Sequence, residues 1–268
     1  MNLSRISGTI LTLLFLTLKA SASPETLVTL SSNYPLNDNG GGTSALLNGV
    51  SVELFCDDFA HQIWAPYSGY TANVSTLTNG SDLSLTRFGT VTSWTTVNVA
   101  ADAVAGGDAT NANDATYSSV INNANALARY QMAAYLVTLY QPSQGPANNP
   151  YNNGIQEAIW TLMDPTPYWG LPSAGDATTA LRSAAQWYSD PGSDKSFLSQ
   201  FEIISDTQMY GCGVGAAQCG GFQEQLYMAA GTTNHDTPTV PEPRAQLLVI
   251  LALLGFYAFR YHSRRKTT

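Results

Sequence analysis

The chain has 268 residues, with 11 Lys and Arg against 19 Asp and Glu, a length that suits one or two domains. Between residues 23 and 240 there are only four basic residues against 18 acidic ones, a net charge of −14. Such a charge excludes nucleic acid and anionic membrane surfaces as favourable partners of this part of the chain.

The first 22 residues are typical of a secretory signal peptide. Arg5 supplies a positive charge, residues 10–18 are apolar, and Ala20-Ser21-Ala22 has the small-residue pattern of a cleavage site. The apolar run is short for a membrane span. We therefore expect cleavage after Ala22, with a retained signal anchor as the alternative.

We predict that residues 23–232 form one exported α+β body. Residues 23–118 are rich in Thr, Ser, Val, Asn and Gly and contain short alternating runs, which favour strands. We expect strands at residues 52–57, 83–85, 91–99, 201–207 and 222–228.

Residues in the middle of this body follow a helical period instead. Apolar residues recur three and four positions apart from Val120 to Val137, as in an amphipathic helix. We expect helices at residues 120–137, 155–164 and 177–188. Ile155, Ile159 and Leu162 form the buried face of the second helix. The order of strands, helices and strands predicts a β-rich domain, sandwich or barrel-like, with a helical insertion.

The C-terminal end combines a linker, an apolar run and a basic cluster. Residues 233–243 are a linker that ends in Pro241-Glu242-Pro243, and residues 244–268 contain an apolar stretch followed by the cluster. The cluster comprises Arg260, Arg264, Arg265 and Lys266. Such cations hold that end on the cytoplasmic side of a membrane. We expect a C-terminal membrane helix, short for a hydrocarbon core of about 30 Å, with a buried core helix as the alternative.

This tail resembles the PEP-CTERM sorting signal of Gram-negative bacteria. The resemblance covers about the last thirty residues, where Val240-Pro241-Glu242-Pro243, one apolar helix and a basic cluster follow in that order. In that family an exosortase recognises the Pro-Glu-Pro motif and processes the tail. The resemblance implies an exosortase as partner, at least transient attachment to the inner membrane, and a destination on the cell surface or in the extracellular matrix. It says nothing about activity.

Export places the three cysteines in an oxidising compartment. Cys212 and Cys219 flank a short Gly-containing loop, which favours a local disulfide over two free thiols. Cys56 is then left over. Because Val52 and Leu54 share its predicted strand face, Cys56 is either an inert buried thiol or a reactive one with a partner nearby.

A second resemblance concerns Cys56. Phe55-Cys56-Asp57-Asp58, followed much later by Gln156-Glu157-Ala158-Ile159-Trp160, is similar to the motifs of bacterial thioester domains of surface adhesins. In that family a Cys on an early strand follows an aromatic residue, and a Gln that opens a Q-x-A-I-W helical segment joins it as an internal thioester. The chain departs from the pattern at Ile155, where Thr is usual, and at Asp57, where an aliphatic residue is usual.

The resemblance implies a thioester between Cys56 and Gln156, shielded from water by Phe55 and Trp160. The thiolate would attack the amide carbonyl, ammonia would leave, and the acyl group would react with a partner's amine or a sugar hydroxyl. The leading hypothesis is a non-enzymatic surface or matrix protein with an adhesin-like module and no cofactor. The alternatives are a non-covalent exopolysaccharide-associated binding or structural protein, and a secreted hydrolase, for which no catalytic set is found.

Two other features carry less information. The three histidines are scattered along the chain, so we expect neither a metal site nor a catalytic triad. Trp64, Tyr67 and Tyr70 lie close together in a loop-like stretch. These aromatic residues either stack on a sugar ring or pack an edge into the core.

Overall fold

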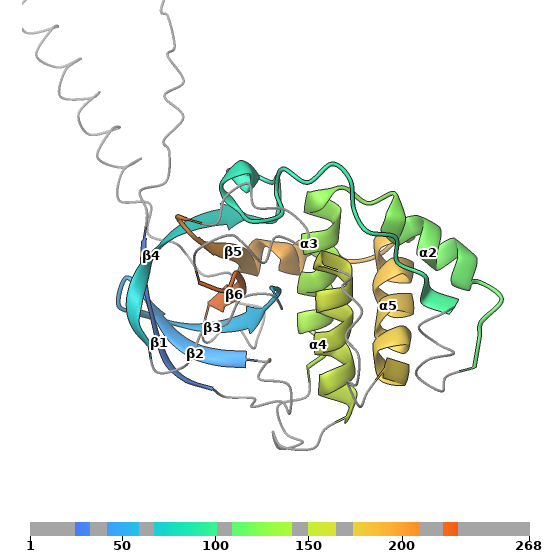
Figure 1. Ribbon diagram of the computed structural model, residues 1–268, viewed down its shortest axis with the longest axis horizontal. Helices are drawn as coiled ribbons and strands as arrows, with labels where there is room; N and C mark the ends of the chain where they lie inside the picture. The colour runs from blue at the N-terminus through green and yellow to red at the C-terminus, as the bar shows by residue number, and fades with distance from the viewer. Residues whose placement is uncertain are drawn as a thin grey trace, which may run out of the picture.

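The computed structural model describes residues 25–32, 42–58, 67–100, 109–140, 150–164, 174–208 and 222–229. Within these residues six strands form a closed barrel and four α-helices lie beside it (Figure 1). Four strands come first along the chain, the helices follow, and two further strands complete the barrel. This arrangement confirms the predicted α+β class, with a barrel and a helical insertion.

All neighbouring strands of the barrel are antiparallel. Their bounds are β1 Glu25–Ser32, β2 Gly42–Leu47, β3 Val50–Cys56, β4 Tyr67–Thr76, β5 Phe201–Asp206 and β6 Gln225–Ala229. The barrel closes in the order β1-β2-β3-β6-β5-β4. The strand that carries Cys56 is therefore paired on both sides, with Cys56 opposite Gln225 of β6.

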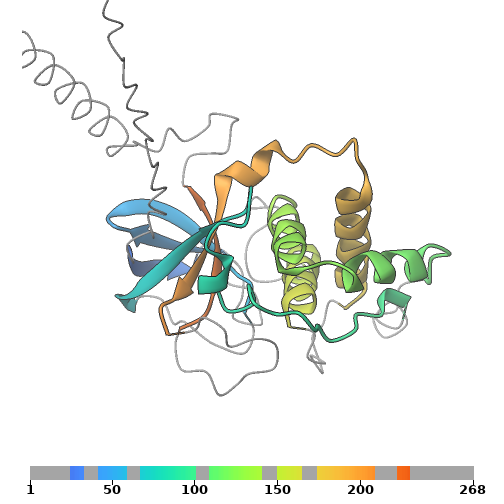
Figure 2. The same cartoon turned by 90° about the horizontal axis from the view of Figure 1, so that it is seen from above.

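The inserted helices pack against one another as well as against the barrel. Their bounds are α2 Asp114–Asn122, α3 Ala126–Val137, α4 Pro150–Met163 and α5 Ala174–Ser189. Helix α4 packs on both α3 and α5, and α2 packs on α5. Figure 2 shows the helices on one side of the barrel, with the chain returning from α5 to β5.

The buried apolar residues form two clusters. One consists of strand residues, among them Leu27, Leu54 and Ile204. The other joins the strands to the helices and includes Phe55 and Ile159. Leu54 and Phe55 belong to different clusters because successive side chains of a strand point to opposite faces. Strand β3 thus contributes to both cores.

Two predicted strands are wrong. Residues 83–85 form a short 3-10 helix, and residues 91–98 contain no strand. In the second segment the backbone N–H of Val97 donates to Asn122 Oδ1, and Asn122 Nδ2 donates to the carbonyl of Val97, both at 2.9 Å. A side chain of α2 therefore satisfies backbone groups that a neighbouring strand would otherwise pair.

The predicted helix over residues 120–137 is divided into α2 and α3. Asn125 stands in an extended conformation before α3, and its side chain accepts a hydrogen bond from the N–H of Ala128 at 2.9 Å. This is the contact that an N-cap residue makes with the first turn of a helix. The apolar stripe continues across the break, since Ala124 and Tyr130 belong to the same core cluster.

Replacing Asn125 with Ala is expected to lower the free energy of unfolding by about 1 kcal/mol, because the N–H of Ala128 loses its cap. Urea unfolding followed by circular dichroism measures this difference. Asn123→Ala is the matched control, since Asn123 is exposed and donates to Ser119 of its own helix. Equal losses in the two variants would contradict a specific cap.

The other elements agree better with the sequence predictions. Helix α4 begins before its predicted start, and its predicted apolar face is buried. Helix α5 spans the predicted residues 177–188, and β6 starts later than expected. Tyr67 and Tyr70 lie in β4 and not in a loop. Tyr70 is buried and stacks on Phe222 at 4.9 Å between ring centroids, so packing into the core is correct for this residue.

Several predictions lie outside the described residues. They are the signal peptide 1–22, the linker 233–243, the Pro241-Glu242-Pro243 motif, the apolar helix and basic tail 244–268, the pair Cys212 and Cys219, and Trp64. Of the helices that are described, none is long and apolar enough to cross a membrane.

Candidate functional site

Cys56 and Gln156 meet where the barrel contacts the helices. Cys56 is the last residue of β3, and Gln156 lies in α4. The Gln156 Nε2 donates a hydrogen bond to the carbonyl oxygen of Cys56 at 2.6 Å, across a separation of 100 residues. Cys56 is 2% exposed and Gln156 is 1% exposed. The fold therefore brings together, at a buried position, the two residues that the sequence motifs single out.

Trp160 contacts the sulfur of Cys56 from the next turn of α4. Its indole Nε1–H donates to Cys56 Sγ at 3.2 Å, and the thiol donates to the carbonyl of Asp58 at 3.3 Å. Burial raises the pKa of the Cys56 thiol well above its ordinary value, and the Trp160 N–H lowers it in part. Cys56 is therefore a thiol at neutral pH, with one donor already directed at the sulfur, where negative charge would develop.

Tyr140 contacts the other end of the Gln156 amide. Its hydroxyl donates to Gln156 Oε1 at 2.8 Å, and its ring lies against Phe55 with centroids 5.3 Å apart. Burial raises the pKa of Tyr140 well above its ordinary value, and the neighbouring Cys56 adds to this effect. The hydroxyl therefore keeps its proton and remains a donor.

Together these contacts fix the orientation of the Gln156 amide. The amide nitrogen is held by the carbonyl of Cys56, and the amide oxygen by Tyr140. The predicted shielding residues Phe55 and Trp160 are both buried at this site. The group contains a nucleophile, an electrophilic carbonyl and a donor to the carbonyl oxygen, which are three of the groups that acyl transfer uses.

Sequence reasoning missed Tyr140. The residue follows the apolar stripe of α3 and directly precedes a Pro- and Asn-rich stretch, where no periodic pattern marks a tyrosine as part of the core, and its side chain is only partly buried. Its role depends on a contact with α4, which no local pattern reports.

A buried ion cluster lies next to Cys56. Arg87 pairs with Asp58, and its Nη2 lies 3.3 Å from Asp164 Oδ2 at the end of α4. Arg87 and Asp58 are fully buried, and Asp164 is nearly so. Burial lowers the pKa of Arg87, while Glu224 and Asp164 raise it. The cluster thus joins the end of β3 to α4 through one guanidinium.

Glu224 connects this cluster to the barrel. Its carboxylate accepts hydrogen bonds from the backbone N–H of Arg87 at 2.7 Å, from the Tyr130 hydroxyl at 2.6 Å and from the Ser205 hydroxyl. Burial raises the pKa of Glu224, and the hydrogen bonds from Ser205 and Tyr130 oppose that rise. Strand β5, helix α3 and the segment before β6 are therefore tied together at one carboxylate.

Asp57 differs from the other acids of this cluster. The residue is fully buried, and no hydrogen bond from the described residues reaches either carboxylate oxygen. Burial and the charge of Glu224 raise the pKa of Asp57 well above its ordinary value, and Arg87 lowers it in part. This environment favours the neutral form of Asp57, at the position where the chain departs from the thioester-domain pattern.

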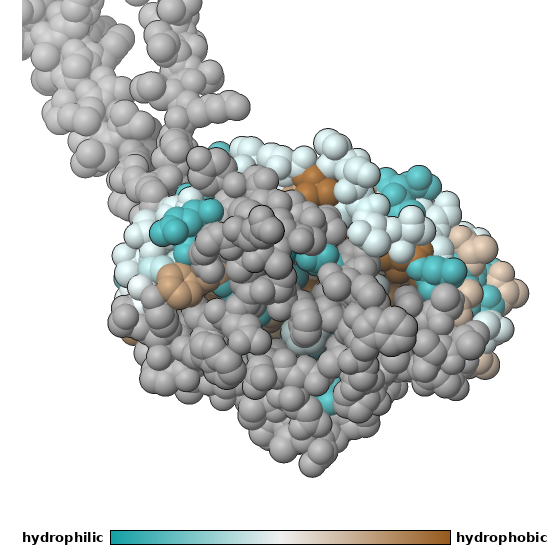
Figure 3. All heavy atoms as spheres, viewed as in Figure 1, coloured by the Kyte–Doolittle hydropathy of each residue, from teal (hydrophilic) through white to brown (hydrophobic). Residues whose placement is uncertain are grey.

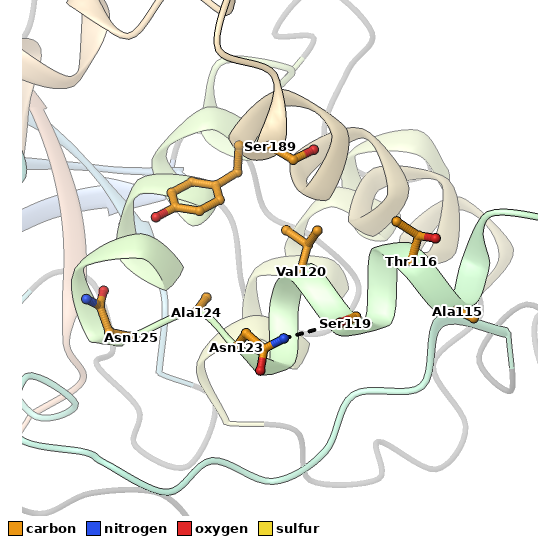
Figure 4. A pocket seen from close by; sticks show the side chains of 9 residues that line it. Ala115, Thr116, Ser119, Val120, Asn123, Ala124, Asn125 and Ser189 are labelled. Atoms are coloured by element: carbon orange, nitrogen blue, oxygen red, sulfur yellow. Dashed lines mark hydrogen bonds between the residues drawn. The ribbon is translucent and has the colours of Figure 1, made fainter.

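A separate hollow of about 670 Å³ lies near α2 and the end of α5 (Figure 4). It is lined by Ala115, Thr116, Ser119, Val120, Asn123, Ala124, Asn125, Tyr188 and Ser189. Several of its polar groups already have partners within the helices. Asn123 donates to Ser119 at 3.2 Å, Asn125 caps α3, and Ser189 donates to a carbonyl of α5 at 2.9 Å. The arrangement at Cys56 is therefore the more specific one.

Comparisons with known proteins give no relative, since no family model, no curated protein and no solved structure matches the chain. Across the part of the chain that the structure describes, no three His, Cys, Asp or Glu side chains are grouped to hold a metal ion. On the same part of the surface, Val50 and Tyr151 are the large apolar side chains that are exposed. The face in Figure 3 shows only small hydrophobic areas among its coloured residues.

Proposed function

We propose that the protein is an exported, exosortase-sorted protein of the cell surface or extracellular matrix that forms an internal thioester between Cys56 and Gln156. The observation that carries the proposal is the orientation of the Gln156 amide. Cys56 holds its nitrogen, Tyr140 holds its oxygen, and Trp160 donates to the sulfur beside it. These contacts favour a role beyond that of an inert buried thiol.

The proposed reaction is an acyl transfer within the chain. The sulfur of Cys56 bonds to Cδ of Gln156, the bond from Cδ to Nε2 breaks, and the thiol proton leaves on that nitrogen as ammonia. A partner's amine can then attack Cδ, forming an amide and returning a proton to the sulfur. Each molecule reacts once, so the product is a covalent attachment and the protein is not an enzyme. Surface amines and exopolysaccharide hydroxyls are the partner chemistries that we propose.

Burial supports this chemistry in two ways. A thioester at Cys56 would be protected from hydrolysis, because Cys56, Gln156 and Trp160 are each at most 2% exposed. The departure from the family pattern at Ile155 is also accommodated, since that side chain is 1% exposed and belongs to the helical core cluster. An isoleucine before Gln156 therefore serves packing and does not displace the glutamine.

The proposed location of the protein is inferred from the two ends of the chain. The proposed signal peptide directs export, and the Pro241-Glu242-Pro243 tail resembles a signal that an exosortase processes at the inner membrane. We propose that the tail holds the protein at that membrane before processing and that the body then reaches the surface or the matrix.

The test is the intact mass of the full chain, which is expected to be one ammonia lighter than the sequence requires. The loss should disappear in Cys56→Ala, whose sulfur is absent. Asn-Gly pairs such as Asn79-Gly80 also lose ammonia when they form succinimides, so a digest must in addition yield one peptide that joins the segments of Cys56 and Gln156. A wild-type chain of full mass, with Cys56 open to alkylation in denaturant, would end the proposal.

A further inference from the structure

We infer that Tyr140 is a catalytic residue of this site, whose hydroxyl stabilises the negative charge that develops on Gln156 Oε1 when sulfur or amine adds to Cδ. The inference rests on the proposed thioester, and it assigns a role to a residue outside both sequence motifs.

The geometry fits such a role. The Tyr140 hydroxyl lies 2.8 Å from Gln156 Oε1 of the unreacted amide, so it is already a donor to the oxygen that becomes the oxyanion. A hydrogen bond to a neutral amide oxygen becomes charge-assisted, and therefore stronger, when that oxygen turns anionic. The donor is in place before the reaction, so no reorganisation is needed when the charge appears.

The surroundings increase the effect. Gln156 is buried, Tyr140 is partly buried, and Phe55 packs on the ring of Tyr140, so screening of the interaction between the hydroxyl and the oxyanion by water is reduced. Burial also raises the pKa of Tyr140. The phenol therefore stays protonated over the pH range in which proteins are handled, and donates throughout that range.

The electron movements show where the charge lies. A sulfur electron pair forms the bond to Cδ, and the π pair of the carbonyl moves to Oε1, which Tyr140 contacts. That pair then re-forms the carbonyl and expels Nε2, which takes the thiol proton and leaves as ammonia. When an amine later attacks the thioester, the charge develops on the same Oε1. Tyr140 is therefore expected to accelerate both the formation and the consumption of the thioester.

The experiment compares wild type with Tyr140→Phe, which keeps the ring against Phe55 and removes the hydroxyl. The full chain is isolated unfolded in denaturant, before the thioester has formed, and is then refolded in mild detergent. Samples are quenched in acid at intervals, and intact mass gives the fraction that has lost ammonia. We expect formation to slow by about a hundredfold to a thousandfold in Tyr140→Phe, the loss typical for one oxyanion donor. The reaction of the formed thioester with methylamine should slow in the same direction.

Tyr135→Phe is the matched control. Tyr135 lies in α3, and its ring stacks on Trp187 at 4.8 Å between centroids. The same chemical change there is expected to leave both rates at the wild-type level. Circular dichroism and thermal unfolding of all three proteins show whether they fold alike.

The outcomes separate this inference from the proposed function. Wild-type rates in Tyr140→Phe would overturn the role of Tyr140 and leave the thioester standing. A wild-type protein that never loses ammonia would overturn both. If Tyr140→Phe does not fold, a fluorinated tyrosine at position 140 replaces it, since a more acidic phenol is a stronger donor. Faster reaction of that protein with methylamine would support the inference, and an unchanged rate would overturn it.

Discussion

Replacing Arg87 with methionine is expected to lower the free energy of unfolding by about 3–5 kcal/mol at neutral pH. Methionine fills much of the same space without charge or hydrogen bonds. Asp58 and Asp164, which pair with Arg87, would then stay buried without their cation. Their desolvation is not reversed when the partner is removed, which is why breaking a buried pair costs more than the pair contributes. Denaturant unfolding measures the loss.

Two further variants test the cause of that loss. Lys195→Met removes a cation from an exposed position near the ring of Trp187, and little change is expected. Arg87→Met combined with Asp58→Leu should be more stable than Arg87→Met alone, because the second change removes one of the uncompensated carboxylates. If the double variant is no more stable, lost packing rather than lost charge accounts for the effect.

Replacing Asp57 with asparagine is expected to stabilise the protein at neutral pH, by about 1.4 kcal/mol for each unit by which the folded pKa of Asp57 exceeds the unfolded one, because asparagine is neutral without taking up a proton. The folded-state pKa of Asp57 lies above its ordinary value of 3.8, chiefly through burial and then through Glu224. The folded chain therefore holds a proton that the unfolded chain releases. The stability that this proton provides is complete below the unfolded pKa and is lost as the pH rises through the folded pKa.

The pH dependence gives the sharper measurement. Asparagine stays neutral, so the advantage of Asp57→Asn over wild type should grow as the pH rises and vanish well below the unfolded pKa of 3.8, where Asp57 is protonated in both states. Because the pKa of Glu224 is also raised, the free energy of unfolding of the variant still depends in part on pH. Asp82→Asn is the control, since Asp82 is exposed with φ 62°, a conformation that asparagine tolerates. Parallel curves for wild type and Asp57→Asn would show that Asp57 is ionised when folded.

Elements with strong periodicity could be predicted from the sequence. Strand β3 alternates between its two cores, and α4 repeats its apolar residues at helical spacing. Residues 91–98 misled the same reasoning, because their alternation looks like a strand while Asn122 bonds to the backbone of Val97. The break between α2 and α3 was missed because the apolar stripe continues across Asn125, whose capping role depends on backbone conformation.

The residues of the candidate site also fall into those that the sequence predicts and those that it does not. Cys56, Gln156 and Trp160 could be found because they stand in short motifs, and their contacts agree with the motifs. Arg87 could not be found, since its partners come from distant parts of the chain that only the fold brings together. Charge counting gives only the net charge of the acidic residues, whereas several of them are buried around this one cation.

The pairing of β3 with β6 has a consequence for the timing of maturation. The last strand of the barrel lies beyond the helical insertion, so the ladder beside Cys56 is completed only when the end of the body is available. Pairings so distant in sequence form late and slowly. In the exported protein that we propose, Cys56 crosses the membrane long before Gln225 does. Barrel closure would then act as a checkpoint that delays bond formation until the whole body is outside the cytoplasm.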